Sequence, residues 1–293
     1  MLTHPSLPPA PSRRAVVLGA AGFIGSAAVR ALRRSGAEVL ALGRAELDLL
    51  APGSAAALGR RLRPDDALVF VSARAPCKHA AMLVENLRMA ETVCAALKAR
   101  PVAHLLYVSS DAVYRDSEAP LTEGSCAEPA SIHGAMHLAR EVLLRAEFPG
   151  PCAILRPTLV YGANDPHNGY GPNRFRRLAA AGGEIVLFGE GEERRDHVSV
   201  DDVGELAARI VRRGSTGVLN AVSGEVVSFR ELAEFTAAQF PRRAPVRGSP
   251  RSGPMPHGGC RAFDASALAP AFPDFRPTPW RQGLAAACAS AAP

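Results

Sequence analysis

Continuous apolar runs and amphipathic stretches alternate along the first half of the chain. The apolar runs predict buried strands at residues 15–18, 38–42, 67–72, 104–109 and 153–155. The stretches between them predict helices at residues 27–34, 82–99 and 131–147. Because the apolar runs are not interrupted by polar residues, both faces of their sheet must be covered, which is typical of parallel sheets in α/β proteins.

A glycine-rich loop separates the first predicted strand from the first predicted helix. Gly19, Gly22 and Gly25 have the spacing of a dinucleotide-binding loop, with Phe23 and Ile24 between the last two. The first glycine permits a tight turn, the second lets the backbone approach a pyrophosphate, and the third lets the helix pack against the strand. The motif predicts a Rossmann-type, doubly wound parallel sheet with a dinucleotide bound at a helix N-terminus.

The end of the second predicted strand bears on the choice between the two nicotinamide cofactors. An acidic residue at this place binds the ribose 2′-hydroxyl of NAD, whereas an arginine accommodates the 2′-phosphate of NADP. The strand here ends in Leu42, Gly43 and Arg44. NADP is therefore favoured over NAD, with a solvated surface arginine as the alternative interpretation of Arg44.

Composition narrows the classes of function without changing this picture. The chain has 293 residues, 47% of them hydrophobic, and a net charge of +6, which suits a sizeable core and excludes a disordered chain. The arginines occur in scattered pairs, not in one basic block, so no nucleic-acid partner is expected. Six separated cysteines without a CxxC pair favour a reduced, cytoplasmic protein, and no apolar run is long enough to cross a membrane.

Further motifs follow the glycine loop in a fixed order. They are Asp48-Leu49, Asn86 in VENL, YVSSDAVY at 107–114, LRPTLVYG at 155–162, GEGEERRDHVSVDDV at 189–203 and GVLNAVSGE at 217–225. With the glycine loop, this set resembles the extended short-chain dehydrogenase/reductase family, also called the NAD-dependent epimerase/dehydratase family, along nearly the whole chain. Most members of that family act on nucleotide sugars.

The resemblance implies how the chain is divided. It implies a Rossmann domain at residues 13–165, to which 198–226 return, and a smaller C-terminal substrate-binding domain made of 166–197 and 227–293. Residues 1–12 are rich in Pro and Ser and are expected to form a flexible tail. A nucleotide-sugar partner is implied as well, and so is a homodimer formed through two helices of the Rossmann domain.

The resemblance also assigns binding roles to single residues. Cofactor contacts are implied for the glycine loop and for Asp48, Leu49, Ser72, Ala73, Asn86 and Ser109. Arg195 is expected on a substrate phosphate, because a guanidinium binds phosphate in a bidentate manner, and Asn173 is expected to be a second substrate contact. An ordinary loop residue or a surface ion pair is the alternative in each case.

The chain departs from the family at the catalytic pair. Family members carry a YxxxK motif, in which the tyrosine exchanges a proton and the lysine lowers the tyrosine pKa and binds the nicotinamide ribose. His133 and His137 stand at these two positions here. The chain has only two lysines, Lys78 and Lys98. Lys78 follows the third predicted strand and is a candidate for the missing positive charge at the substrate, with a solvated loop lysine as the alternative.

Three interpretations of the histidine pair stay open. In the first, His133 replaces the tyrosine as acid/base, since imidazole titrates near neutrality, and His137 bonds the ribose or supports His133. Ser110 and Asp111 would complete that catalytic set. In the second, redox chemistry is lost and the protein is a non-catalytic nucleotide-binding sensor or scaffold. In the third, the pair binds a metal ion, but the sequence offers no third ligand nearby, so no metal is expected.

One neighbouring residue narrows the reaction. The family's 4,6-dehydratases carry an Asp-Glu pair where this chain has Asp111-Ala112, so dehydration of that type is not expected. The sequence therefore predicts an NAD(P)-dependent epimerase or reductase that transfers a hydride at a carbon of a nucleotide sugar, with His133 in place of the usual tyrosine.

Overall fold

A six-stranded parallel sheet forms the centre of the larger part of the molecule. The computed structural model describes residues 1–5 and 14–290. Within that range the strand order of the sheet is β2-β1-β3-β4-β5-β9, and every neighbouring pair is parallel. The strands are β1 (Ala15–Leu18), β2 (Val39–Leu42), β3 (Ala67–Phe70), β4 (His104–Val108), β5 (Cys152–Pro157) and β9 (Gly217–Ala221).

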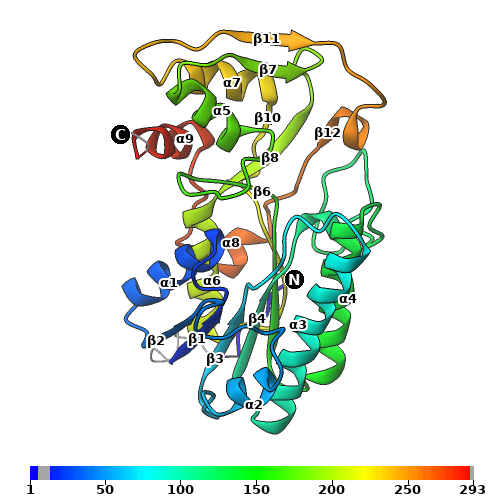
Figure 1. Ribbon diagram of the computed structural model, residues 1–293, viewed down its shortest axis with the longest axis vertical. Coiled ribbons are helices and arrows are strands. Elements are labelled where there is room, and N and C mark those ends of the chain that lie inside the picture. Colours follow the sequence, from blue (N-terminus) through cyan, green and yellow to red (C-terminus); the bar gives the residue numbers. More distant parts are fainter. Residues whose placement is uncertain (6–13, 291–293) are drawn as a thin grey trace.

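Helices cover both faces of this sheet (Figure 1). On one face lie α1 (Phe23–Arg34) and α6 (Val200–Arg213), and on the other lie α2 (Ser54–Gly59), α3 (Ala80–Ala99) and α4 (Ile132–Glu147). Successive residues of a strand point to opposite faces, so Val17 packs with α1 and α6 while Val16 packs with α2 and α3. Burial on both faces explains the uninterrupted apolar runs of the sequence, and the predicted doubly wound parallel α/β fold is confirmed.

Two helices begin before the positions that the hydrophobic pattern marks. Helix α1 begins at Phe23, directly after the N-cap Gly22, instead of at residue 27. Helix α3 begins at Ala80, because the side chain of His79 caps it by accepting a hydrogen bond from the Met82 N–H at 3.4 Å. Capping residues, and not the apolar periodicity, therefore decide where these helices begin.

The smaller part is built around β8 (Arg194–Ser199). This strand pairs antiparallel with β10 (Val226–Ser228) and parallel with β6 (Leu159–Tyr161) and β12 (Cys260–Arg261). A separate parallel pair consists of β7 (Ile185–Phe188) and β11 (Val246–Ser249). Three helices pack against these strands over a second apolar core, namely α5 (Pro172–Ala180), α7 (Phe229–Ala237) and α9 (Trp280–Ala289).

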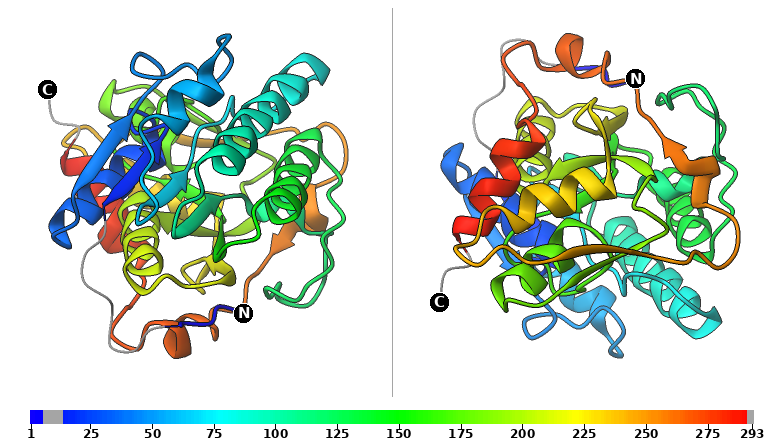
Figure 2. Two further views of the ribbon diagram at one scale, coloured as in Figure 1. Left: turned by 90° about the horizontal axis from the view of Figure 1, so that it is seen from below. Right: turned by 90° about the horizontal axis from the view of Figure 1, so that it is seen from above.

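The chain passes between the two parts more than once. Strand β8 continues directly into α6, which packs on α1, and β9 then joins the large sheet beside β5. Later, Phe263, Phe272 and Phe275 pack into the core of the large sheet. The segment around α8 (Leu268–Ala271) therefore lies against the Rossmann part, although the resemblance places all of 227–293 in the smaller domain. Figure 2 shows this segment beside the N-terminus in both views.

The first residues of the chain are docked, which differs from the expected flexible tail. Thr3 forms a β-bridge with Thr216. The His4 ring bonds the Ser215 hydroxyl and the Ala271 carbonyl, each at 2.8 Å, so both ring nitrogens are used. The rest of that predicted tail, residues 6–12, lies outside the described residues. In the described part of the chain, no helix has the length and apolar character needed to cross a membrane.

Candidate active site

A cavity of about 930 Å³ opens at the carboxyl ends of the parallel strands. It lies where the strand order reverses between β1 and β3, the usual place for a ligand in an open α/β sheet. Its walls come from the glycine loop, the loops after β2, β3 and β4, the first turn of α4, and residues of the smaller part. The volume is typical of a site for a cofactor-sized ligand.

The glycine loop has the close backbone approaches that a dinucleotide site requires. Gly19 has φ +85°, and a Cβ on it would lie 2.9 Å from the Cα of Ser72. A Cβ on Gly25 would lie 2.0 Å from the carbonyl oxygen of Gly19, so only glycine lets α1 pack against the loop. Gly22, Phe23 and Ile24 line the cavity at the N-terminus of α1, whose first turn holds no acidic residue. These residues fit the pyrophosphate of a nicotinamide dinucleotide.

Residues of opposite charge line the cavity after β2. Arg44 carries a side chain that is 78% exposed, and its Nε donates to Asp48 Oδ2 at 3.2 Å. A backbone hydrogen bond from Leu50 holds the pKa of Asp48 below its ordinary value, so this carboxylate is ionised. Asp48 and Leu49 line the cavity as the resemblance implies. The rim here offers both an arginine and a carboxylate to the ribose end of a cofactor.

The loop after β3 contains two predicted cofactor contacts. A third predicted contact, Asn86, supports this loop from outside the cavity. Ser72 and Ala73 line the cavity. Asn86 does not: it is fully buried, accepts from the Arg74 N–H at 2.9 Å and donates to the Arg74 carbonyl at 3.0 Å. Its amide therefore supports the loop from outside the cavity, in contrast to the direct cofactor contact that the resemblance implies.

Lys78 lies away from the cavity. It is exposed and does not contribute to the lining, in contrast to the expected substrate contact. The buried residue before it, Cys77, turns inward, and its backbone N–H donates to Nδ1 of His133 at 3.3 Å. This loop therefore contributes a backbone N–H to the site, and not the ammonium group of Lys78.

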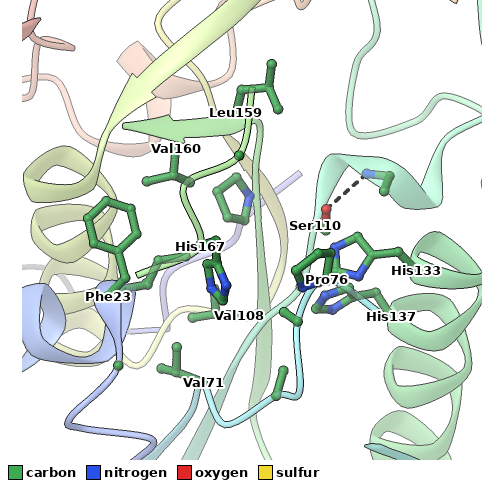
Figure 3. A pocket seen from close by; sticks show the side chains of 18 of the residues that line it. Phe23, Val71, Pro76, Val108, Ser110, His133, His137, Leu159, Val160 and His167 are labelled. Carbon is green, nitrogen blue, oxygen red and sulfur yellow. Dashed lines mark hydrogen bonds between the residues drawn. The ribbon is translucent and has the colours of Figure 1, made fainter. Parts of the chain in front are cut away.

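Ser109, Ser110 and Asp111 line the cavity where β4 ends. The Ser109 hydroxyl donates to Glu141 Oε1 at 2.6 Å, inside the protein. Ser110 caps the short 3₁₀ turn Asp111–Val113 by accepting from the Ala112 N–H at 3.2 Å, and its hydroxyl lies 3.3 Å from Asp111 Oδ1. Figure 3 shows Ser110 near the histidine pair, with its hydroxyl bonded to the backbone of the turn.

The two histidines of α4 come together at the wall of the cavity (Figure 3). Their rings are perpendicular, with centroids 4.7 Å apart. His137 is buried, and its Nδ1 lies 2.7 Å from the Tyr107 hydroxyl. Burial lowers the pKa of His133, with Asp111 opposing part of that change, and burial together with His133 and Arg140 lowers the pKa of His137 far more. Both rings are therefore neutral at neutral pH.

A glycine between the histidines brings α4 close to Ser110. A Cβ on Gly134 would lie 1.9 Å from the Ala112 carbonyl oxygen, so no other residue lets the helix approach the 3₁₀ turn. Gly134 is a functional residue that the sequence analysis missed, although a glycine in the first turn of a helix is a usable sign of close packing. Among the described residues, no group of three or more His, Cys, Asp or Glu side chains is placed to hold a metal ion.

The far side of the cavity belongs to the smaller part. Arg195 lines it with a side chain that is 13% exposed, and its Nε donates to Glu193 Oε1 at 2.8 Å. Asn173 also lines it, but both ends of its amide are used: Oδ1 accepts from the Gly162 N–H at 3.0 Å, and Nδ2 donates to the Val160 carbonyl at 3.2 Å. Asn173 therefore holds the end of β6 while it faces the cavity.

Sequence reasoning missed a charged cluster at the same wall. The Arg261 Nη1 donates to Asp116 Oδ1 at 2.5 Å, and the His257 ring contacts the same carboxylate. Arg261 also lies 3.3 Å from Asp111 Oδ2, so the carboxylate of Asp111 is paired with a cation. These residues are up to 150 positions apart, and no local spacing reveals that they meet.

Comparison with known proteins places this chain in a family. Residues 15–222 match the model of the NAD dependent epimerase/dehydratase family. The chain is 29% identical to dTDP-4-dehydro-6-deoxy-D-allose reductase of Streptomyces bikiniensis, over 93% of this chain and 94% of that protein. It is 31% identical to UDP-glucose 4-epimerase of Mycolicibacterium smegmatis, over 75% of this chain and 80% of that protein.

Solved structures agree on the fold. UDP-glucose 4-epimerase of Thermus thermophilus in complex with NAD superposes with a TM-score of 0.83 at 23% identity, covering 94% of this chain and 98% of that one. GDP-mannoheptose C4 reductase of Campylobacter jejuni with NADP bound superposes with a TM-score of 0.78 at 17% identity, covering 94% and 96%. Because the family match covers residues 15–222, most of its length, the chain belongs to the NAD-dependent epimerase/dehydratase family.

Proposed function

We propose that the protein is an NAD(P)-dependent epimerase or reductase that transfers a hydride at a carbon of a nucleotide sugar. The observation that carries this proposal is the composition of one cavity. It joins the glycine loop to Ser110, the pair His133 and His137, and Arg195. Relatives named as a dTDP-sugar reductase and a UDP-sugar epimerase support the same class of substrate.

Each of these residues receives a role from its chemistry. A bound nicotinamide cofactor supplies or accepts the hydride. Ser110 and His133 bond the oxygen on the reacting carbon. His133, in place of a tyrosine, offers its Nε2–H to the negative charge that develops on this oxygen during reduction, and water supplies the proton that completes the hydroxyl. Arg195 holds a phosphate of the substrate with the guanidinium nitrogens that Glu193 does not use. His137 bonds the nicotinamide ribose through the ring nitrogen that faces the cavity.

We infer further that NADP is the preferred cofactor. The support is Arg44, whose exposed guanidinium lies at the rim where a 2′-phosphate would extend. Its present partner is Asp48 in an exposed pair, and such pairs are worth little, so a phosphate can replace that carboxylate.

A non-catalytic nucleotide-binding protein is the second candidate. One observation favours it: Ser110 caps a turn, and one nitrogen of each histidine is engaged within the protein. Fewer polar groups of the cavity wall are then free to act on a substrate than the list of lining residues suggests. Both candidates predict that the cofactor binds, so turnover is what distinguishes them.

The test is turnover with a panel of dTDP-, UDP- and GDP-linked 4-keto sugars and NADPH or NADH, followed by the absorbance of the reduced cofactor. UDP-glucose and UDP-galactose, each with NAD, test epimerisation through product analysis. His133→Ala is expected to lose turnover at least a hundredfold while it keeps cofactor binding. His79→Asn, outside the cavity and still able to cap α3, is the control. Full turnover by His133→Ala would remove His133 from the mechanism, and cofactor binding without turnover on any substrate would favour the second candidate.

We also infer a homodimer formed through α3 and α4. These helices pack on each other on one side of the sheet, and each exposes a large apolar side chain. Val84 is 47% exposed and Val142 is 58% exposed. Apolar side chains on two adjacent helices are suited to pairing with a second copy of the same surface.

A further inference from the structure

A fully buried cation lies one helical turn after His137. Arg140 is 0% exposed, and its guanidinium carbon lies 4.2 Å from the centroid of the Phe70 ring. Its Nη2 donates to the Ser72 carbonyl at 2.8 Å, and its Nε has no hydrogen-bond partner in the described part of the chain. None of the ion pairs among the described residues includes it. A buried charge without a counter-ion is costly, so this arrangement calls for a functional reason.

The cation is connected to His137 through one phenol. Tyr107 is 0% exposed, and the Arg140 guanidinium carbon lies 5.3 Å from the centroid of its ring. Burial raises the pKa of Tyr107 to about 12, and the neighbouring Arg140 opposes part of that rise. The hydroxyl is therefore protonated, and its oxygen lies 2.7 Å from Nδ1 of His137. Arg140, Tyr107 and His137 thus form a buried row that ends at the wall of the cavity.

The direction of the hydrogen bonds in this row follows from what each group can do. A guanidinium only donates, so Arg140, which packs against the Tyr107 ring, cannot accept the hydrogen of the Tyr107 hydroxyl. The Tyr107 hydrogen then needs an acceptor, and Nδ1 of His137 is the acceptor within reach. If Nδ1 of His137 carried a hydrogen instead, it would donate to the Tyr107 oxygen, and the hydrogen of the Tyr107 hydroxyl would be buried without a partner. The hydrogen of the neutral His137 ring therefore sits on Nε2.

We propose that Arg140 and Tyr107 are positioning residues that fix His137 as the neutral tautomer with its Nε2–H directed to the cavity. The inference rests on the proposed function, in which His137 bonds the nicotinamide ribose. The chain thereby presents a fixed hydrogen-bond donor at this wall without a lysine ammonium. The unpaired charge of Arg140 also disfavours a second proton on His137, and its guanidinium packs against the ring of the phenol that bonds the imidazole.

The test reads the tautomer directly. Long-range ¹H–¹⁵N correlation spectra of protein labelled with ¹⁵N-histidine distinguish protonated from unprotonated ring nitrogens, and His137→Asn assigns the signals by their loss. In the native protein we expect a protonated Nε2, an unprotonated Nδ1, and no change between about pH 5 and pH 8. In Tyr107→Phe, which keeps the aromatic ring but removes the hydroxyl, we expect mixed tautomers. The dissociation constant for NADPH is expected to rise about tenfold in that variant.

A second variant tests the charge. Arg140→Met is expected to raise the pKa of His137, so that its protonation begins at a higher pH than in the native protein although burial still opposes it, and Arg140→Lys, which keeps a charge and a donor, is expected to restore the native spectrum. If Arg140→Met does not fold, Tyr107→Phe still decides the proposal. Tyr114→Phe is the matched control, because Tyr114 is also buried and its hydroxyl donates to Asn220 Oδ1 at 2.7 Å. The guanidinium carbon of Arg156 lies 4.8 Å from the centroid of the Tyr114 ring. Tyr114→Phe is expected to leave the His137 signals unchanged.

Two outcomes overturn the inference: a protonated Nδ1 in the native protein, or His137 signals that are the same in Tyr107→Phe as in the native protein. The histidine spectra do not depend on turnover. If the protein turns over a nucleotide sugar but carries a protonated Nδ1 on His137, this inference fails and the proposed function stands. If the spectra show the expected tautomer but the protein turns over no nucleotide sugar, the inference about the tautomer stands and the proposed function fails.

Discussion

The backbone N–H of Cys77 donates to Nδ1 of His133 over a distance of 3.3 Å. A backbone amide can only donate, so this bond leaves the hydrogen of the neutral imidazole on Nε2. Burial lowers the pKa of His133, which keeps the ring in that neutral form. His133 therefore offers an N–H to a substrate oxygen in the cavity, as a neutral histidine does when it polarises a carbonyl group.

This geometry predicts the pH dependence of turnover. We expect kcat/KM in the reducing direction to be constant near neutral pH and to fall as the pH falls through the lowered pKa of His133, below the ordinary value of 6.5. The pH profile of the native protein measures this directly, and His133→Asn, which keeps a donor but does not titrate, should lack the acidic limb. A profile that instead falls as pH rises through neutrality would show that the imidazolium is the active form.

Arg44 is expected to decide between the cofactors. Arg44→Ala should raise the dissociation constant for NADP about tenfold or more, because a charge-assisted contact to the 2′-phosphate is lost, and should leave NAD binding nearly unchanged. Titration calorimetry with both cofactors measures the difference. Arg60→Ala, an exposed arginine outside the cavity, is the control. Equal effects of Arg44→Ala on the two cofactors would contradict the preference for NADP.

The ion pair between Glu141 and Arg156 is expected to be important for stability. Arg156 donates to the two carboxylate oxygens of Glu141 at 2.9 Å and 2.6 Å. The side chain of Glu141 is 0% exposed and that of Arg156 is 5% exposed. Glu141→Ala should lower the free energy of unfolding by about 3–5 kcal/mol, because it leaves a buried guanidinium uncompensated. Glu128→Ala, which breaks an exposed pair with Arg115, should cost less than about 1 kcal/mol. Urea unfolding of the two variants and the native protein measures both losses of unfolding free energy. Similar losses in the two variants would contradict the prediction that the buried pair is the more important one.

His197 is expected to make the protein sensitive to acid. Burial lowers the pKa of His197 to about 3, from an ordinary value of 6.5. Between these pH values the unfolded chain binds a proton that the folded protein does not, so stability falls as the pH falls from 6.5 toward 3. The preceding residue opposes this trend, because burial raises the pKa of Asp196 to about 6.

The contribution of His197 is therefore measured as a difference. His197→Gln should show a shallower loss of unfolding free energy with acidification than the native protein, while the opposing effect of Asp196 is common to both. Denaturant unfolding at a series of pH values provides the two slopes. Parallel slopes would mean that His197 does not stay neutral in the folded protein.

Val142 is expected to lie in the dimer interface. Val142→Glu should convert the dimer into a monomer in size-exclusion chromatography with light scattering, because it places a charge on an apolar contact. Val186→Glu is the control, since Val186 is also a large exposed apolar residue, 40% exposed, but lies on β7 in the smaller part. A native protein that is monomeric at every concentration, or equal effects of the two changes, would refute the interface.

The sequence by itself determined the core of the fold and the cofactor loop. Residues 15–18 are apolar throughout, and burial of such a run requires cover on both faces of the sheet, so a parallel α/β fold follows from local pattern. Gly19 and Gly25 were predictable for a similar reason, because the approaches they permit lie within one strand–loop–helix unit. The motif order that marks the family is likewise a property of the chain read from end to end.

Only the tertiary structure decided which groups surround the histidine pair. The Cys77 N–H reaches His133 across 56 residues, and Arg261 reaches Asp111 across 150. Lys78, the lysine that the sequence suggested for the missing positive charge, is exposed, whereas Arg140, buried behind Tyr107, is the cation whose charge lowers the pKa of His137. Hydrophobic periodicity reports the face of a helix or strand that is buried. It does not report which side chains from distant elements meet there, because that depends on how the elements are connected and packed.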